Sequence, residues 1–332
     1  DKIEIFKRSK KSTQSKLINL TKINKLKKKE RAQVTKDLKK ITAKRKNFLK
    51  NVNFSEPTIM GILNLTPDSF SDGGKFNKKD KSLKQISKMI NSGAKIIDAG
   101  GESTRPGSKS IDTITEWKRV QEVIKSFKKK NKKICLSLDT RKSDIMLKGI
   151  RYGADLINDV SGFSYEKDSL NKIKQHKKVA KVIHHMKGTP NTMQINPKYN
   201  NVLLDIYDFF QKKYNNVLLD IYDFFEKKIN SKIIGKKIIL DPGIGFGKTL
   251  KHNLSLISNI SLFHSLGFPI MIGTSRKRFI NQISGKNDSE DRTGGTIASV
   301  LYLLSQGVQI FRVHNVNEVK QGILVFGKIL NN

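Results

Sequence analysis

The sequence predicts an α/β protein folded as a (β/α)8 TIM barrel with a basic N-terminal extension. Three observations favour this fold class. From Pro57 onward, short apolar runs recur eight times with helix-like segments between them, which is typical of parallel β/α units. Nearly every run ends in a polar residue capable of chemistry, and parallel barrels build their sites at the carboxyl ends of the strands. The chain of 332 residues is also long enough for one barrel of about 250 residues.

The eight apolar runs are the expected strands of this barrel. They span residues 58–65, 95–99, 134–139, 155–160, 180–186, 237–241, 269–274 and 308–314. The polar residues at or near their carboxyl ends are Asn64, Asp98, Asp139, Asn158, His185, Asp241, Ser275 and Arg312. In a closed barrel these side chains converge on one mouth, whereas in an open doubly wound sheet they could not all meet. Their placement therefore favours the barrel.

The first 55 residues differ from the rest of the chain, and residues 56–332 form the expected barrel. Residues 1–50 contain no proline and no glycine, and they hold 19 lysine or arginine residues against 4 aspartate or glutamate residues. Their apolar periodicity is weak. The pattern leaves two structures open: a disordered segment, or two short helices ordered by packing against another surface.

The formal net charge of +36 indicates which classes of partner to expect. Such a charge ordinarily indicates nucleic acid or an anionic membrane. Here the basic residues spread over the whole chain without interleaved stacking aromatics, so we expect a solvated surface that attracts anionic substrates, without nucleic acid as partner. The longest unbroken apolar run, residues 300–304, is too short to span a membrane. The single cysteine, Cys135, excludes an intramolecular disulfide, and a cytoplasmic enzyme is expected.

A tandem duplication lies between the fifth and sixth expected strands. Residues 198–212 (KYNNVLLDIYDFFQK) recur as residues 213–227 (KYNNVLLDIYDFFEK), with 14 of 15 positions identical. The spacing of their apolar residues is helical. The barrel needs one helix of about 10–14 residues at this place, so one copy is surplus. The sequence leaves open which copy packs against the strands.

Two glycine-bearing loops follow the first two expected strands. The segment IMGILNLTPDSFSDGG, residues 59–74, contains turn residues typical of a long loop that covers a barrel mouth. The segment DAGGESTRPGS, residues 98–108, has adjacent glycines that allow close backbone approach. In the same segment, these glycines are followed by Ser103, Thr104 and Arg105, whose side chains can contact an anion. Alone, this second segment is a weak phosphate signal.

Together with five later segments, these loops resemble the dihydropteroate synthase family. The later segments are SLDTRK at 137–142, INDVSG at 157–162, LDPGIGFGK at 240–248, GTSRK at 273–277 and FRVHNV at 311–316. The seven motifs occur in order, and the resemblance covers roughly residues 57–330. It implies a (β/α)8 barrel that joins 6-hydroxymethyl-7,8-dihydropterin pyrophosphate to p-aminobenzoate in folate synthesis, releasing pyrophosphate and 7,8-dihydropteroate. The family is the target of sulfonamides, which mimic p-aminobenzoate.

The resemblance assigns residues to each substrate. The implied pterin site consists of Asp139, Asn158, Asp241 and Lys277, which pair with the polar edge of the ring, and of Met186 and Phe246, which form apolar walls. The implied pyrophosphate site consists of Asn64, Thr104, Arg105, Arg312 and His314. Asn64 is also the implied contact of a Mg²⁺ cofactor. The implied p-aminobenzoate site consists of Thr104, Ser275 and Arg278.

The mechanism that the resemblance implies is dissociative. Pyrophosphate leaves first, the carboxylate of Asp139 stabilises the resulting pterin cation, and the aniline nitrogen of p-aminobenzoate then attacks. Arg105 and Lys277 are the other residues implied to act in catalysis. The loops at 66–76 and 102–109 are expected to exclude water from the cation.

Some features depart from the family pattern, and other functions stay open. Arg278 stands where some members carry a serine that helps to hold the p-aminobenzoate carboxylate, and the extension and the duplication are atypical. The expected assembly is a homodimer. One alternative is a methyltetrahydrofolate-dependent methyltransferase, which would share the ring-binding residues but would not need the first loop or the pair Arg312 and His314. Another is a catalytically weakened scaffold whose basic extension binds nucleic acid.

Overall fold

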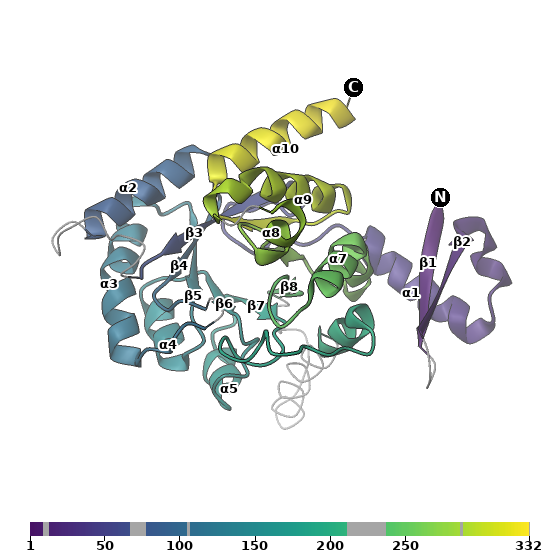
Figure 1. Cartoon of the computed structure of the whole chain (residues 1–332), viewed down its shortest axis with the longest axis horizontal. Helices are drawn as coiled ribbons and strands as arrows, with labels where there is room; N and C mark the ends of the chain where they lie inside the picture. Colours follow the sequence, from purple (N-terminus) through teal and green to yellow (C-terminus); the bar gives the residue numbers. More distant parts are fainter. Residues whose placement is uncertain (9–12, 67–77, 105–106, 211–236, 286–287, 332) are drawn as a thin grey trace.

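Eight parallel strands form the centre of the molecule, and helices surround them (Figure 1). The computed structural model describes all residues except 9–12, 67–77, 105–106, 211–236, 286–287 and 332. The central strands are β3 (Thr58–Asn64), β4 (Ile96–Gly100), β5 (Cys135–Asp139), β6 (Leu156–Asp159), β7 (Ala180–His184), β8 (Ile238–Asp241), β9 (Met271–Ile272) and β10 (Ile310–Val313). Each lies within, or one residue beyond, the apolar run that predicts it.

The order of these strands closes a barrel, which confirms the predicted fold class. Hydrogen bonds join the strands in the order β8-β7-β6-β5-β4-β3-β10-β9, and all of these pairs are parallel. The two ends of this order meet at a parallel bridge between Leu240 and Ile270. Beside it, the Leu240 N–H donates to the Pro269 carbonyl over 2.9 Å. The carboxyl ends of all eight strands therefore open on the same mouth.

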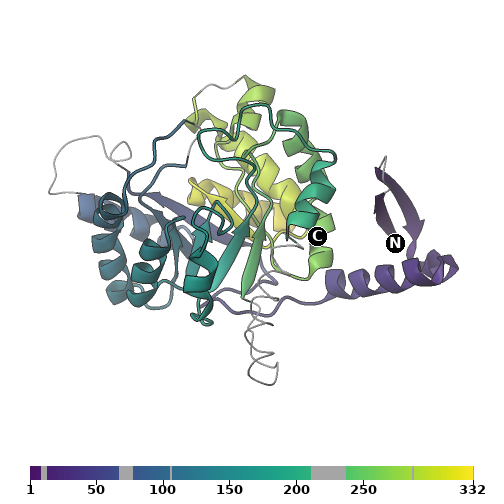
Figure 2. The same ribbon diagram turned by 90° about the horizontal axis from the view of Figure 1, so that it is seen from below.

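Helices alternate with the strands and cover the outside of the barrel (Figures 1 and 2). They are α2 (Lys78–Asn91), α3 (Thr113–Lys130), α4 (Ser143–Arg151), α5 (Ser169–Lys174), α7 (Leu250–Ser258), α8 (Arg278–Ser284), α9 (Thr293–Ser305) and α10 (Val316–Leu330), with the 3-10 helices η4 (Ile260–Leu266) and η5 (Glu290–Arg292). Their apolar faces form one core with outward strand residues such as Ile97, Leu136 and Phe311. Within the described residues, no helix combines the length and the apolar character needed to cross a bilayer.

Inward strand residues form a second core near the amino-terminal end of the barrel. They are Met60, Ile96, Cys135, Leu156, Ala180, Val182, Ile239, Met271 and Ile310. Leu49, Val52 and Phe54 are buried in the same cluster, so the segment just before β3 closes this end of the barrel. The structure thus places residues 49–54 with the barrel, although the sequence suggests a boundary after residue 55. Three apolar residues among polar ones in a short loop carry no periodic signal.

The extension contains helices, as one of the two structures left open by the sequence has it, and also a pair of strands that neither of them includes. Strands β1 (Lys2–Arg8) and β2 (Thr13–Asn19) pair as an antiparallel hairpin, followed by the 3-10 helix η1 (Leu20–Lys25) and the helix α1 (Lys28–Thr42). Helix α1 lies between the hairpin and the barrel and contacts η4 (Figure 1). The strands escaped prediction because frequent lysines obscure their alternation of apolar and polar residues.

The first copy of the duplication packs against the barrel. Residues 202–210 are helical, and Phe210 within them is buried in the outer core. The hydroxyl of Tyr199 donates to the carbonyl of Gly247 over 2.9 Å, which ties the first copy to the segment that follows β8. Residues 213–227, the second copy, lie outside the described residues. The first copy therefore supplies a helix between β7 and β8.

Phe54→Ala is expected to lower the free energy of unfolding by about 3–5 kcal/mol, because it leaves a cavity where the Phe54 ring is only 4% exposed. Urea denaturation followed by circular dichroism measures this. Leu17→Ala in the hairpin, where the residue is 60% exposed, serves as the control and is expected to change stability by less than about 0.5 kcal/mol. A loss below about 1 kcal/mol for Phe54→Ala would contradict a role in closing the barrel.

Deletion of residues 213–227 is expected to preserve the fold and the activity while changing solubility or oligomeric state. It removes one whole period and leaves the contacts of the first copy in place. Deletion of residues 199–213 yields the same chain except that glutamate stands in place of Gln211. The two deletion variants are therefore expected to behave alike, and each serves as a control for the other. Thermal unfolding, size-exclusion chromatography and an activity assay test this. Loss of activity in a folded deletion variant would show that both copies support the site.

Candidate active site

One cavity of about 1,230 Å³ opens at the carboxyl ends of the strands. It brings together the predicted site residues Asn64, Thr104, Asp139, Asn158, Asp241, Phe246, Ser275, Lys277, Arg278, Arg312 and His314. Met186 does not line this cavity. Because β7 ends at His184, residue 186 lies beyond the strand, and Val160 and Ile244 supply apolar lining instead. Arg105, assigned to pyrophosphate and to catalysis, lies outside the described residues.

An ion cluster forms the floor of the cavity. Arg312 on β10 donates from Nε to Asp98 Oδ2 over 2.7 Å and from Nη2 to Asp139 Oδ2 over 2.6 Å. The amide of Asn158 donates to the same oxygen of Asp98 over 3.0 Å. The sequence assigns Arg312 to the leaving pyrophosphate, but its guanidinium here pairs with two carboxylates. A fully buried carboxylate such as Asp98 requires a cation and hydrogen-bond donors.

Burial controls the protonation of this cluster. It raises the pKa of Asp139 to about 7, although Arg312 opposes the rise, and the neighbouring carboxylate of Asp98 adds to it. Burial alone would lower the pKa of Arg312, but Asp98 and Asp139 raise it above its ordinary value. Asp139 therefore titrates near neutral pH beside a guanidinium that stays charged.

Lys277 and Phe246 lie together on the cavity wall. The ammonium of Lys277 is 3.8 Å from the centroid of the Phe246 ring. Burial lowers the pKa of Lys277 to about 7, and repulsion from Arg312 contributes. Burial also raises the pKa of Asp241 to about 6, while the N–H of Gly243, which donates to its Oδ1 over 2.8 Å, opposes the rise. The wall thus offers an ammonium that can lose its proton near neutral pH, a carboxylate and an aromatic face.

His184 completes this wall as a neutral side chain. Its Nδ1 lies 2.8 Å from the carbonyl of Val160, so Nδ1 carries the proton and donates. Burial lowers the pKa of His184 well below its ordinary value. Its Nε2 lies 3.9 Å from Asp241 Oδ2, and because the ring is neutral this contact is not an ion pair. The next residue, His185, instead contacts Lys248 outside the cavity floor, as expected for adjacent residues of a strand.

The segment after β8, which carries Phe246, is held by side chains from the connection between β7 and β8. Gln194 donates to the carbonyl of Gly245 over 2.8 Å, and Tyr199 to that of Gly247. Gly243 has a φ of +69°, and a Cβ there would lie 1.9 Å from a neighbouring carbonyl oxygen, so only glycine fits. These constraints fix the position of the Phe246 ring.

Polar residues from several loops form the rim. Ser275 Oγ lies 3.0 Å from His314 Nδ1. Arg278 begins α8 and is exposed, while Ser103 and Thr104 reach the rim from the loop after β4. The rim is thus rich in groups that can bind an anion.

Asn64, at the end of β3, is the residue that sequence reasoning assigns to Mg²⁺. Its amide oxygen is of the hard type that Mg²⁺ prefers. In the part of the chain that the structure describes, no three His, Cys, Asp or Glu side chains are grouped to hold a metal ion. A magnesium ion at Asn64 would therefore take most of its ligands from substrate and water, which is common for this ion.

The sequence assigns no substrate to Asp98, His184 or Lys248, although all three belong to the site. Asp98 was identifiable as the polar end of a strand, but nothing in the sequence indicates its pairing with Arg312. His184 lies two residues before Met186 and Lys248 two residues after Phe246, and both Met186 and Phe246 were assigned. The Lys248 ammonium donates to the carbonyl of Phe246 over 2.8 Å, and burial lowers its pKa well below its ordinary value. His184 and Lys248 line the cavity beside the ring-binding residues, whereas Asp98 accepts from Asn158 beneath the floor.

Asp98→Asn is expected to lower the free energy of unfolding by about 1–3 kcal/mol, because an amide cannot balance the buried guanidinium of Arg312. Since Asp98 raises the pKa of Asp139, the same change is expected to lower that pKa. Denaturant unfolding and NMR titration of the Asp139 carboxyl carbon measure the two effects. Asp144→Asn, on the exposed face of α4, is the control, and an unchanged Asp139 pKa in Asp98→Asn would contradict the coupling.

Comparison with known proteins identifies the family. The family described as "Pterin binding enzyme" matches residues 60–314. The dihydropteroate synthase of Escherichia coli is 36% identical over 275 residues, which cover 83% of this chain and 92% of that protein. The dihydropteroate synthase of Haemophilus influenzae is 39% identical over 268 residues, which cover 80% of this chain and 92% of that protein.

Solved structures agree with these relatives. The Yersinia pestis dihydropteroate synthase with a sulfonamide drug superposes with a TM-score of 0.75 at 34% identity, covering 85% of this chain and 97% of that one. The Xanthomonas albilineans dihydropteroate synthase in complex with 7,8-dihydropteroate superposes with a TM-score of 0.72 at 27% identity, covering 85% and 96%. On the extent and identity of these matches, the chain belongs to the dihydropteroate synthases within the pterin-binding enzyme family.

Proposed function

We propose that this chain condenses 6-hydroxymethyl-7,8-dihydropterin pyrophosphate with p-aminobenzoate, yielding 7,8-dihydropteroate and pyrophosphate. The observation that carries the proposal is the convergence of Asp139, Asn158, Asp241 and Lys277 in one cavity. A pterin presents an edge of hydrogen-bond donors and acceptors that this set can match. Two structures of the Xanthomonas albilineans relative, one with 7,8-dihydropteroate and one with 4-aminobenzoic acid, support the choice of product and second substrate.

The floor of the cavity suits the pterin ring. Asn158 Oδ1 is buried, and none of the described residues donates a hydrogen bond to it. An unpaired buried acceptor is costly, so a ring N–H is the expected donor. Asp241 can accept from further N–H groups of the ring, and Lys277 can donate to its carbonyl. Phe246 would cover one face of the ring.

The ion cluster suits the charge that develops during the reaction. As the bond to pyrophosphate breaks, positive charge spreads from the methylene carbon into the pterin ring. Asp139 at the floor supplies the compensating negative charge, and Arg312 holds its carboxylate in a fixed orientation. The aniline nitrogen of p-aminobenzoate then bonds to the methylene from the rim and releases a proton to solvent.

The pyrophosphate is proposed to lie at the rim beside Asn64, Thr104 and His314. Asn64 would hold Mg²⁺ together with substrate oxygens, and the bound ion would neutralise charge on the leaving group. The lining residues Lys277 and Arg278 add positive charge to the same mouth. The net charge of +36 favours the approach of this polyanion from a distance.

We also infer a homodimer that works in the cytoplasm. Helices α9 and α10, which contact each other, expose the large apolar residues Tyr302, Leu324, Val325, Ile329 and Leu330. An exposed apolar patch of this kind favours association with a second copy. The single buried Cys135 is consistent with a reducing compartment. Sedimentation of Val325→Lys is expected to show monomer where the unaltered chain shows dimer.

Product formation from the pterin pyrophosphate and p-aminobenzoate in the presence of Mg²⁺ tests the proposed activity. Asp139→Ala and Lys277→Ala are each expected to cost about 2–4 kcal/mol of transition-state stabilisation, the range for losing one preorganised charged group. The exposed Lys251→Ala on α7 serves as a control for loss of positive charge alone. Either variant at Asp139 or Lys277 turning over normally while folded would exclude its assigned role.

The pH dependence of kcat/KM for the pterin pyrophosphate is expected to be bell-shaped with a maximum near pH 7. The pKa of Asp139 is raised to about 7, so its carboxylate form is lost below that pH. The pKa of Lys277 is lowered to about 7, so its ammonium form is lost above it. Lys277→Arg, which keeps its charge, is expected to lose the alkaline limb. Retention of that limb in the variant would assign it to another group.

Arg278→Ser is expected to raise the KM for p-aminobenzoate and to alter sulfonamide inhibition, because Arg278 lies at the rim where a carboxylate can reach both its side chain and the start of α8. Steady-state kinetics at saturating pterin pyrophosphate measure both constants. Arg276→Lys serves as the control, because the guanidinium of Arg276 is already paired with Glu290 and Asn315. If the two constants do not change in Arg278→Ser, the Arg278 side chain does not contact p-aminobenzoate.

A further inference from the structure

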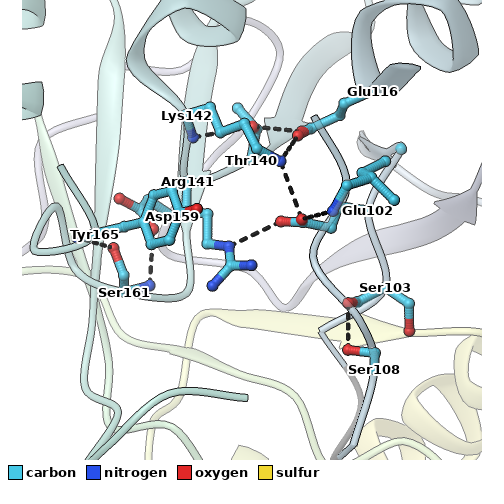
Figure 3. A network of polar contacts seen from close by, with 12 residues as sticks. Glu102, Ser103, Ser108, Glu116, Thr140, Arg141, Lys142, Asp159, Ser161 and Tyr165 are labelled. Carbon is cyan, nitrogen blue, oxygen red and sulfur yellow. Dashed lines mark hydrogen bonds and ion pairs between the residues drawn. The ribbon is translucent and has the colours of Figure 1, made fainter. Parts of the chain in front are cut away.

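A buried network of charged side chains connects the loop after β4 to the residues that directly follow Asp139 (Figure 3). Glu102 lies at the start of this loop, and Glu116 lies on α3. Arg141 and Lys142 follow the end of β5. The side chains of these four residues are at most 8% exposed, and two carboxylates balance two cations. The network is therefore neutral as a whole and rigidly paired.

Glu102 is the centre of this network. Its Oε2 accepts from Arg141 Nε over 2.8 Å. Its Oε1 accepts from Lys142 Nζ and from the backbone N–H of Ile111, each over 3.0 Å. Burial alone would raise the pKa of Glu102, but these three donors lower it, so the side chain stays a carboxylate. Because Ile111 lies nine residues further along, one carboxylate joins the start of the loop to its end.

The other members of the network anchor this carboxylate to rigid structure. Lys142 Nζ donates to Glu116 Oε2, and Thr140 Oγ1 donates to Glu116 Oε1, each over 2.5 Å. The guanidinium of Arg141 lies 4.2 Å from the centroid of the Tyr165 ring. The loop after β4 is thus attached to α3 and to the end of β5, where Asp139 is located.

The loop presents polar residues to the rim of the cavity. Ser103 and Thr104 follow Glu102 directly and line the cavity. A second link crosses the loop, since Ser108 Oγ donates to the Ser103 carbonyl over 2.6 Å. The ring-binding Asn158 and Asp241 are buried at the floor. Ser103 and Thr104 also line the cavity but are only half-buried, so they face its outer part.

We propose that Glu102 is a positioning residue, whose carboxylate holds Ser103 and Thr104 at the rim for the binding of p-aminobenzoate. It acts through other residues, because Arg141, Lys142 and the Ile111 N–H occupy both of its oxygens. The inference rests on the proposed function, since it assigns the effect to p-aminobenzoate. Glu116 shares the network, but among the described residues its carboxylate accepts only from Thr140 and Lys142, and this makes it the matched control.

Steady-state kinetics of Glu102→Gln and Glu116→Gln separate positioning from a purely structural role. We expect Glu102→Gln to raise the KM for p-aminobenzoate about five- to tenfold. The reason is that p-aminobenzoate must then order one or two rim side chains that Glu102 otherwise holds in place. The KM for the pterin pyrophosphate, to which Thr104 adds one of several proposed contacts, is expected to rise less, by no more than about threefold. Glu116→Gln is expected to lower the unfolding temperature without the rise in KM for p-aminobenzoate. Equal kinetic changes in the two variants, or none in Glu102→Gln, would overturn the proposal.

Hydrogen exchange of the Ile111 amide gives a reading that needs no substrate. The bond to Glu102 is expected to protect this amide in the unaltered chain, and Glu102→Gln is expected to speed its exchange about tenfold or more. Unchanged exchange would contradict the proposal even if the chain made no product. Failure of the unaltered chain to make product would instead contradict the proposed function.

A milder variant covers the case in which Glu102→Gln does not fold. Arg141→Met removes one donor to Glu102, so only Lys142 and the Ile111 N–H hold the carboxylate and it is less firmly fixed. It is expected to raise the KM for p-aminobenzoate about threefold and to speed exchange of the Ile111 amide, with thermal unfolding as the check on folding. A folded Arg141→Met variant without either change would overturn the proposal.

Discussion

The pairing of Arg312 with Asp98 and Asp139 is the interaction on which the rest of the site depends. In the strand order, β10 is separated from β4 by one strand and from β5 by two. In a flat sheet, β10 and β5 would lie about 14 Å apart, three interstrand spacings, which is too far for a hydrogen bond at the observed 2.6 Å. The pairing is therefore possible only because the sheet closes on itself. The chemistry of the floor therefore depends on barrel closure.

This cluster also determines the electrostatics of the cavity. The guanidinium holds Asp139 in place and adds to the burial that lowers the pKa of Lys277. Burial raises the pKa of Asp139 and Asp241 toward neutrality. The result is a set of groups that can change protonation near neutral pH inside a chain of net charge +36. Such a site attracts an anionic substrate from a distance while keeping the few charges at the floor paired.

Two unusual parts of the chain, the extension and the first copy of the duplication, lie around the barrel. The hairpin and α1 sit at one edge of the molecule, away from the strand ends (Figure 1). The first copy of the duplication fills the position of a barrel helix, and through Tyr199 it supports the segment that carries Phe246. One copy of the duplicated sequence thus serves as a barrel helix. By contrast, Leu49, Val52 and Phe54, which carry no recognisable pattern, belong to the inner core of the barrel.

The sequence by itself determined the barrel and most of the residues that line its mouth. Apolar runs and the polar residues that end them are local features, and parallel strands deliver those ends to one place whatever the details of packing. It could not determine which of these side chains pair, because Asp98 and Arg312 lie 214 residues apart and meet only across the closed barrel. Nor could it show that Met186 lies outside the cavity, or that residues 2–8 and 13–19 pair as antiparallel strands. Those features depend on where strands end and on what packs beside them, and only the tertiary structure decides both.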